Sequence, residues 1–227
     1  GFGEPFLDKL IFERISYIKS KGNYYVKLFS NAGLLDKEKT AKALSSGLDE
    51  IVISFNGITK ETYEKVMKIN FEKSFANFTN FIDERNKSGK KTPRIVLSCI
   101  RLTDNKEEIK KVNKFWEGKA DQILKPIPEN WSGSLNLKSP WKYNFKNKMW
   151  PCKGMWNTLD FLWNGRVSLC CRDFDGKVIL GDINKSSVKE IMDKKREIGR
   201  KQLNADDYSY TPICYRCDTI TRNAVMW

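Results

Sequence analysis

Hydrophobic and polar positions in the first half of the chain alternate between two periods. Over residues 6–21 apolar side chains recur every three or four positions, which predicts a helix lying on a core and ending at Gly22. Residues 24–29 have the composition of a short strand, and residues 36–45 read as a helix that begins at an aspartate and ends before Gly47. The pattern therefore predicts a strand between two helices.

The same alternation continues to about residue 130. Residues 50–55, 94–100 and 122–127 are apolar runs of strand length. Between the first two runs the spacing predicts one helix, N-capped by Thr59 and extending towards Arg85. Its apolar stripe consists of Phe71, Phe75, Phe78 and Ile82.

A further helix is predicted between the last two strands. Asn105 and Glu108 have the spacing of a capping box, in which each side chain bonds the other residue's backbone amide. Strands that alternate with helices in this way predict right-handed βαβ units and a parallel sheet, either open or curled into a barrel.

Polar residues follow three of the predicted strands. They are residues 30–33 (Ser-Asn-Ala-Gly), residues 54–57 (Ser-Phe-Asn-Gly) and Arg101. In parallel sheets, functional groups gather at the carboxyl ends of the strands. Each loop taken alone is equally consistent with an ordinary turn between a strand and a helix.

A different architecture is predicted after residue 130. Residues 131–150 lack periodicity and are interpreted as a linker. Two short strands, residues 158–163 and 166–170, flank an Asn-Gly pair that favours a type I′ hairpin turn. Ser187 and Glu190 then form a second predicted capping box, at the start of a helix.

Chain length, net charge and the length of the apolar runs limit which classes of protein this can be. The 227 residues, 40% of them hydrophobic, can bury one sizeable core and a smaller second one. The net charge of +13 would suit an anionic partner. The lysines are spread along the whole chain, however, so we interpret them as residues on solvent-exposed helix faces and do not expect nucleic acid as a partner. No apolar run is long enough to span a bilayer, which favours a soluble cytoplasmic protein without a membrane partner.

Cysteine is the main candidate for unusual chemistry. Histidine is absent, which excludes histidine bases and histidine metal ligands, whereas six cysteines in a lysine-rich chain indicate metal or redox chemistry before disulfides. A hairpin can bring Cys152 close to Cys170, and Cys214 with Cys217 supplies a second pair. Four thiolates suit zinc or an iron–sulfur cluster, and spacing alone does not choose between them.

The two remaining cysteines have other readings. Cys171 could replace Cys170, but neighbouring residues of a strand point to opposite faces, so one of the two should face away. Cys99 lies among apolar residues and is predicted to be a buried core residue.

Taken together, these segments resemble the radical S-adenosylmethionine (SAM) enzymes that carry an auxiliary-cluster domain of the SPASM or shorter twitch type. Residues 1–5 (Gly-Phe-Gly-Glu-Pro) are similar to the family's GGEP segment, and residues 30–35 and 54–57 are similar to its next two strand-end motifs. The resemblance implies an α/β fold in which residues 1–130 are the C-terminal part of a partial (β/α)6 barrel.

The second half resembles the family more specifically. Cys152, Gly165 and Cys170 fit its Cx(9 to 15)GxxxxC pattern, and Cys214 and Cys217 complete it. The resemblance implies that residues 151–227 form a small α+β SPASM/twitch domain. Because no cysteine follows Cys217, the single-cluster twitch type fits better, with these four cysteines as ligands of a 4Fe-4S cluster.

The chain departs from the family at one point. The family's CxxxCxxC triad, which holds the cluster that cleaves SAM, is absent. In the family that triad precedes GGEP, so we expect it, and a second 4Fe-4S cluster, upstream of Gly1. The chain by itself is then expected to be inactive.

The resemblance also implies a reaction and its site. In the family a reduced cluster transfers an electron to SAM, and the resulting 5′-deoxyadenosyl radical abstracts hydrogen from a peptide, a sugar or another small molecule. A flavodoxin or ferredoxin is the expected reductant. The residues that would bind SAM are Gly3, Glu4, Ser30, Asn31, Ser54, Asn56 and Arg101.

Two other functions compete with this one. A zinc-stabilised basic protein would use the same four cysteines structurally and the charge for nucleic acid, but it leaves the strand-end motifs unexplained. A non-catalytic scaffold that keeps the fold without the triad is the other.

Overall fold

In the computed structural model, residues 3–135, 152–204, 211–215 and 217 can be described. They divide into two compact units. The first is Gly3–Pro128, and the second comprises the described residues from Glu129 onward. Each has a hydrophobic core of its own, as the composition predicts. The linker expected over residues 131–150 lies mostly outside the described residues.

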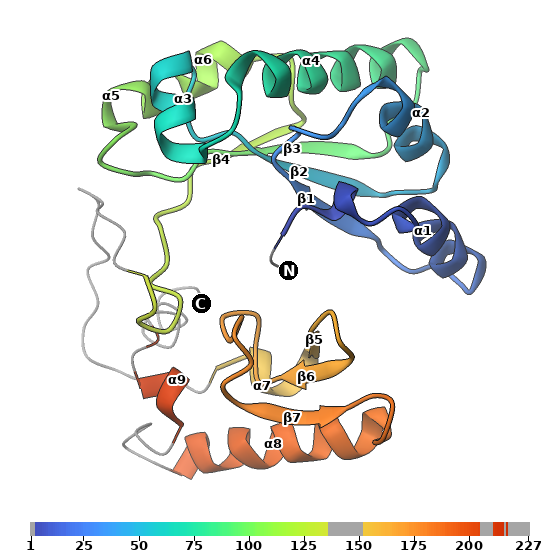
Figure 1. Cartoon of the computed structure of the whole chain (residues 1–227), viewed down its shortest axis with the longest axis vertical. Coiled ribbons are helices and arrows are strands. Elements are labelled where there is room, and N and C mark those ends of the chain that lie inside the picture. Colours follow the sequence, from blue (N-terminus) through green and yellow to red (C-terminus); the bar gives the residue numbers. More distant parts are fainter. Residues whose placement is uncertain (1–2, 136–151, 205–210, 216, 218–227) are drawn as a thin grey trace. The chain divides into compact units, whose positions relative to one another are not determined.

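The first unit is built on a parallel sheet (Figure 1). Its strands are β1 (Lys27–Ser30), β2 (Glu50–Ser54), β3 (Arg94–Ser98) and β4 (Gln122–Leu124). They lie in sequence order, and every neighbouring pair is parallel. The carboxyl ends of the strands therefore share one edge of the sheet, and Ser54 lies opposite Ser98 there. The parallel α/β arrangement predicted from the sequence is confirmed.

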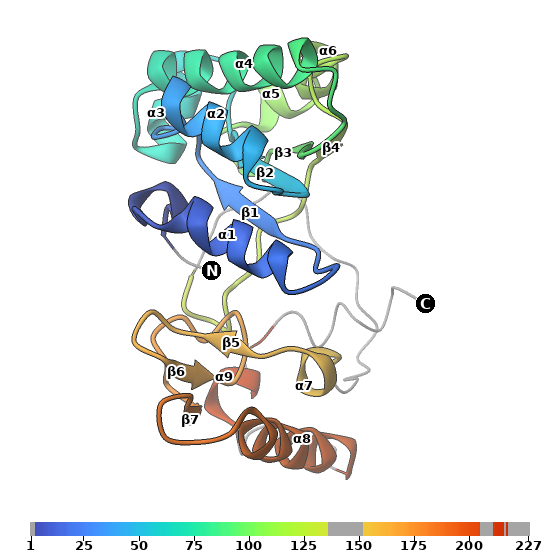
Figure 2. The ribbon, with the colours of Figure 1, turned by 90° about the vertical axis from the view of Figure 1, so that its right-hand side faces the viewer.

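Helices connect the strands, and α2, α3 and α4 lie side by side along the sheet (Figures 1 and 2). None of the helices among the described residues combines the length and apolar character needed to cross a bilayer. The helices of this unit are η1 (Pro5–Leu7), α1 (Ile11–Ser20), α2 (Lys37–Ser45), α3 (Lys60–Met67), α4 (Phe71–Lys87), α5 (Lys106–Ile109) and α6 (Val112–Trp116).

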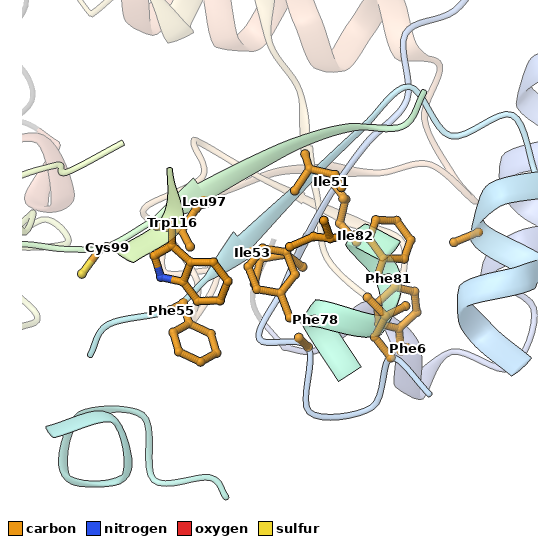
Figure 3. Close-up of a cluster of buried hydrophobic side chains, with 14 of the residues drawn as sticks. Phe6, Ile51, Ile53, Phe55, Phe78, Phe81, Ile82, Leu97, Cys99 and Trp116 are labelled. Atoms are coloured by element: carbon orange, nitrogen blue, oxygen red, sulfur yellow. The ribbon is translucent and has the colours of Figure 1, made fainter. Parts of the chain in front are cut away.

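Aromatic rings fill the space between the sheet and its helices (Figure 3). Phe55, which follows β2, lies 5.2 Å from Trp116, measured between ring centroids, and Phe78 of α4 lies 4.9 Å from the same indole. These three side chains are fully buried. Aliphatic residues of β2 and β3 face them: Ile51, Ile53 and Leu97.

The predicted single helix from Thr59 to Arg85 is wrong. Thr59 does cap a helix, since its hydroxyl accepts a hydrogen bond from the amide of Thr62. That helix ends at Lys68, which adopts a left-handed φ of 59°, and Asn70 caps a second one. Side-chain periodicity continued across this break, and the capping asparagine was the signal that the prediction overlooked.

The predicted capping box at Asn105 is also wrong. The Asn105 side chain does not cap α5. Its amide instead donates to the carbonyls of Asn56 (3.0 Å) and Ile100 (2.7 Å), and its oxygen accepts from the amide of Leu102 (2.9 Å). The Asn105 side chain therefore bonds residues of other loops and not the end of the helix. The predicted helix is two short helices, α5 and α6.

The second unit combines a small antiparallel sheet with helices. Its strands lie in the order β5 (Asp160–Phe161), β6 (Arg166–Ser168) and β7 (Ile179–Asp182). They pair antiparallel. The helices are α7 (Gly154–Asn157), α8 (Val188–Asn204) and α9 (Pro212–Tyr215), of which α8 is the longest (Figure 2).

Two local predictions for this unit have different outcomes. The capping box at Ser187 is confirmed: the amide of Ser187 donates to the Glu190 carboxylate (2.8 Å), and the amide of Glu190 to the Ser187 hydroxyl (3.2 Å).

The prediction of a type I′ turn at Asn164 and Gly165 is wrong, because of these two residues only Gly165 has a positive φ (83°). The Gly165 amide donates to the Leu162 carbonyl (3.0 Å), giving a three-residue connection instead of a two-residue one.

Candidate functional site

The second unit gathers cysteines from three separate segments. Cys152 precedes α7, Cys170 follows β6, and Cys214 lies in α9 with Cys217 just beyond it. All four line one cavity of about 210 Å³. The hairpin and the C-terminal segment thus bring the two predicted pairs to the same place.

Neighbouring groups donate hydrogen bonds to these sulfur atoms. The backbone amides of Gly154 and Arg172 donate to Cys152 and Cys170. The Gln202 side chain of α8 donates to the sulfur of Cys214 (3.4 Å). N–H donors directed at sulfur stabilise thiolates and tune the metal centres that they ligate.

Burial favours the protonated form of three of these thiols when no metal is bound. Desolvation raises the pKa of Cys170 to about 12 and also raises the pKa values of Cys152 and Cys214. The nearby thiols add to this effect because several thiolates would repel one another. A metal centre would therefore have to displace protons as it binds, as is general for cysteine ligands.

The donor set fits an iron–sulfur cluster in its chemistry. Four soft sulfur donors share a partly apolar cavity, with N–H groups directed at them. Across the described residues, no three cysteine, aspartate or glutamate side chains converge closely enough to hold one metal ion. The sulfurs line the cavity wall, which suits a group with several metal atoms.

The two remaining cysteines lie in different surroundings, and the prediction that Cys99 is a buried core residue is confirmed. Cys99 is fully buried in the core of the first unit. Burial raises its pKa to about 12, so it stays a thiol. Cys171 is exposed, but its side chain also reaches the wall of the cysteine cavity, and the guanidinium of Arg172 lies 3.4 Å from its sulfur.

In the first unit, Glu4 links the beginning of the described chain to the end of β1. Its carboxylate accepts hydrogen bonds from the Ser30 hydroxyl (2.8 Å) and the Asn31 amide (2.9 Å). The Ser30 oxygen in turn accepts from the Ala32 amide (3.0 Å). The structure therefore brings together three of the predicted SAM-binding residues, and Gly3 beside them has a φ of 94° that favours glycine. Gly1 and Phe2 of the same motif lie outside the described residues.

The other predicted residues lie at the ends of the next strands. Ser54 is the last residue of β2. The Asn56 side chain accepts from the Ile100 amide (2.8 Å) and donates to the Met67 sulfur (3.1 Å), so its amide braces two loops. The Arg101 amide donates to the Pro126 carbonyl (2.8 Å) beyond β4. All of these residues follow the carboxyl ends of parallel strands.

Several residues that shape the sites were missed from the sequence. Gln202 connects two of the cysteine segments, because its oxygen also accepts from the Cys152 amide (3.3 Å). Arg172 lines the cysteine cavity. Arg172 directly follows the Cys170-Cys171 pair, which was an available signal. Gln202 lies among charged and polar residues of α8, and nothing in the local sequence marked it.

Residues 152–218 match a protein-family model, SPASM, described as an iron-sulfur cluster-binding domain. This part of the chain is therefore similar to a SPASM domain. The match covers the hairpin, α8 and all four cysteines of the cavity. No curated protein matches the chain in a sequence comparison.

Solved structures of SuiB from Streptococcus suis resemble the fold. SuiB matches with a TM-score of 0.62 at 13% identity over 84% of this chain and 53% of that chain. SuiB bound to precursor peptide SuiA matches with 0.51 at 17% identity, over 61% of this chain and 30% of that one. SuiB bound to S-adenosylmethionine matches with 0.43 at 18% identity, over 53% and 27%.

These similarities concern the fold, and the chain spans only about a third to a half of the SuiB chains that it matches. The SPASM match agrees with the auxiliary-cluster domain predicted from the sequence, and the SuiB structures share the fold.

Proposed function

We propose that the SPASM domain binds one auxiliary 4Fe-4S cluster through Cys152, Cys170, Cys214 and Cys217. The observation that carries this proposal is the single cavity lined by all four cysteines within a domain that matches an iron–sulfur family. Each iron of such a cluster takes one thiolate. When bound, the cluster would supply one-electron redox chemistry.

The chain's own residues define the cluster's environment. The amides of Gly154 and Arg172 and the Gln202 side chain orient three of the four sulfurs. With four protein ligands no iron is left open for a substrate, which favours electron transfer over direct ligation of substrate. This arrangement is that of a twitch-type domain.

For the whole protein, we propose a radical SAM enzyme that abstracts hydrogen from its substrate. The parallel sheet would then be part of a (β/α)6 partial barrel. Glu4, held by Ser30 and Asn31, is placed at a strand end where a polar cofactor binds in parallel sheets. Gly3, Ser54, Asn56 and Arg101 would complete the SAM site. A second 4Fe-4S cluster on a CxxxCxxC triad belongs to this proposal.

A peptide is the substrate class with support among the comparisons. SuiB, whose fold resembles this one, has a structure bound to its precursor peptide SuiA. Sugars and other small molecules are the alternatives from the sequence, and a flavodoxin or ferredoxin is the proposed reductant.

The test is anaerobic reconstitution of the full chain with iron and sulfide, followed by metal analysis and visible absorption spectroscopy. We expect about four irons per chain and a broad visible absorption band. Cys152→Ala should lose most of the iron, because it removes a ligand from a buried site.

Two matched cysteine variants serve as controls. Cys99→Ala should keep its iron while losing stability, because Cys99 is a core residue of the other unit. Cys171→Ala should also keep its iron. Tightly bound zinc without iron, or full iron content in Cys152→Ala, would contradict the proposed ligand set.

A further inference from the structure

Two residues that line the cysteine cavity each have a buried hydrogen-bond donor with no acceptor among the described residues. They are Nε of Arg172 and Oγ of Ser132. Both atoms are shielded from solvent, neither bonds any of the residues that the structure describes, and both residues line the cavity. A buried donor without an acceptor destabilises the folded state, so native proteins rarely keep one without a reason.

The guanidinium of Arg172 is held in place from one side. Its Nη2 lies 2.5 Å from a carboxylate oxygen of Glu129, and its Nη1 donates to the Cys171 sulfur at 3.4 Å. Only 17% of the Arg172 side chain is exposed. These contacts use the two terminal nitrogens of the planar guanidinium, and Nε is left without a partner among the described residues.

The charge of Arg172 is secure in this setting. Arginine is not deprotonated in proteins, and the ion pair with Glu129 compensates the desolvation of its guanidinium. The guanidinium is therefore a permanent positive charge beside the cysteines.

Ser132 reaches the cavity through an unfavourable backbone conformation. Trp131 and Ser132 have positive φ angles of 49° and 57°, which are uncommon for consecutive residues other than glycine. The Trp131 indole contacts Phe174 edge to face, with ring centroids 6.5 Å apart. Strain of this kind is retained where it positions a group for function.

Lys195, a buried cation of the same domain, provides a contrast with Arg172. Lys195 is fully buried, and its ammonium group contacts the Thr158 carbonyl (2.8 Å), the Thr158 hydroxyl (3.1 Å) and the Asp160 carboxylate (3.4 Å). These partners occupy all three of its donors. Lys195 is thus satisfied by the protein, whereas Arg172 Nε and Ser132 Oγ need acceptors from the cavity.

We propose that Arg172, positioned by Glu129, and Ser132 donate hydrogen bonds to the sulfur atoms of the iron–sulfur cluster and thereby raise its reduction potential. This inference rests on the proposed function. A cation and N–H or O–H donors beside a cluster stabilise the reduced state, which carries one more negative charge. Arg172 and Ser132 then set how readily the auxiliary cluster accepts an electron.

The experiment is a redox titration of the reconstituted full chain with dithionite and mediators, followed by electron paramagnetic resonance, with iron content measured for each variant. We expect Arg172→Gln to shift the midpoint potential to a more negative value. Arg172→Lys keeps the charge but loses the Nε donor, so its shift should be smaller. Ser132→Ala should also shift the potential negatively, with little change in volume.

Arg196→Gln is the matched control, because it removes the same charge from an exposed position on α8, where solvent screens it. Its potential should equal that of the wild type. Unchanged potentials in iron-loaded Arg172→Gln and Ser132→Ala would overturn the inference and leave the proposed function standing. If Arg172→Gln fails to assemble the cluster, Arg172→Lys and Ser132→Ala decide. A wild-type chain that takes up no iron would overturn both.

Discussion

At the scale of single residues, the surroundings of a cysteine decide its role. Cys99 lies in an apolar core and acts as a small hydrophobic side chain. Cys170 is only half-buried, and it shares a cavity with other cysteines and receives a hydrogen bond from the Arg172 amide. Burial raises the pKa of both thiols to about 12. Only Cys170 has neighbouring groups that would offset the free-energy cost of losing its proton when a metal binds.

Glu4 is a residue whose structural and proposed binding roles can be separated. Its carboxylate accepts three hydrogen bonds, from Phe6, Ser30 and Asn31. Glu4→Ala leaves these donors without an acceptor, so we expect a loss of about 2 kcal/mol in the free energy of unfolding. Urea unfolding measures that loss without any ligand. The exposed Glu107→Ala should change stability little.

The same variant tests the proposed SAM site. At a temperature where Glu4→Ala remains folded, equilibrium dialysis should show weaker binding of S-adenosylmethionine than in the wild type. Equal binding by the two proteins would contradict the role of Glu4 in that site and would leave its structural role intact.

At the scale of elements, side chains that join neighbouring segments fix the loops around the sheet. Glu108 of α5 accepts hydrogen bonds from the Ile58 amide (2.5 Å) and the Thr59 hydroxyl (2.5 Å), nearly fifty positions earlier. Asn105 joins the loops after β2 and β3 in the same way. These long-range bonds join the start of α3 to α5 and the loop after β2 to the loop after β3.

Glu50 connects three strands at the opposite edge of the sheet and makes stability depend on pH. Its carboxylate contacts Lys27 (2.6 Å) and Arg94 (3.2 Å), and only 6% of its side chain is exposed. The hydrogen bond from Lys27, with others from Tyr25 and Arg94, holds the pKa of Glu50 below its usual 4.5 despite desolvation. Its contribution to stability is therefore full above about pH 4.5 and is lost as the pH falls through the folded-state pKa.

Glu50→Gln should remove this contribution. We expect the variant to be less stable than the wild type near neutral pH by on the order of 1–2 kcal/mol, since both cations remain partly solvated. The difference should shrink as urea unfolding is repeated at decreasing pH from about 7 to 3. Glu38→Gln, at a 74% exposed ion pair, should show almost no difference at any pH. A gap for Glu50→Gln that is independent of pH would contradict the electrostatic account.

At the scale of the whole molecule, two compact units with separate cores share one chain. The first buries an aromatic cluster between sheet and helices. The core of the second is smaller, and the cysteines are part of it: Cys214 is a core residue, and Cys152, Cys170 and Cys217 pack against it. A small core of this kind commonly depends on a metal centre for stability.

Cluster binding should accordingly stabilise one unit and leave the other unchanged. We expect hydrogen exchange of the full chain to slow in β6, β7 and α8 when the cluster is reconstituted, because a ligand that binds only the folded state stabilises it. Exchange in β2 and β3 should not change. Mass spectrometry of peptides from both units gives this comparison in one sample. Equal protection of both units on iron loading would show that they do not respond separately.

The sequence by itself determined the features that depend on local chemistry. Periodicity predicted the parallel strands, and Ser187 with Glu190 predicted the start of α8. These two predictions are confirmed because side-chain period and capping need only neighbours along the chain. Cysteine spacing supplied the candidate ligands, which stay a prediction.

The tertiary structure alone decided which polar groups meet. The Asn105 side chain does not cap α5 as predicted and instead donates to the carbonyls of Asn56 and Ile100 in other loops. The same is true of Arg172, which reaches the cysteine cavity through its pairing with Glu129, more than forty positions away. Hydrogen bonds and ion pairs between residues far apart in the sequence form only when the fold has brought the partners together. No local sequence pattern specifies which distant residues become partners.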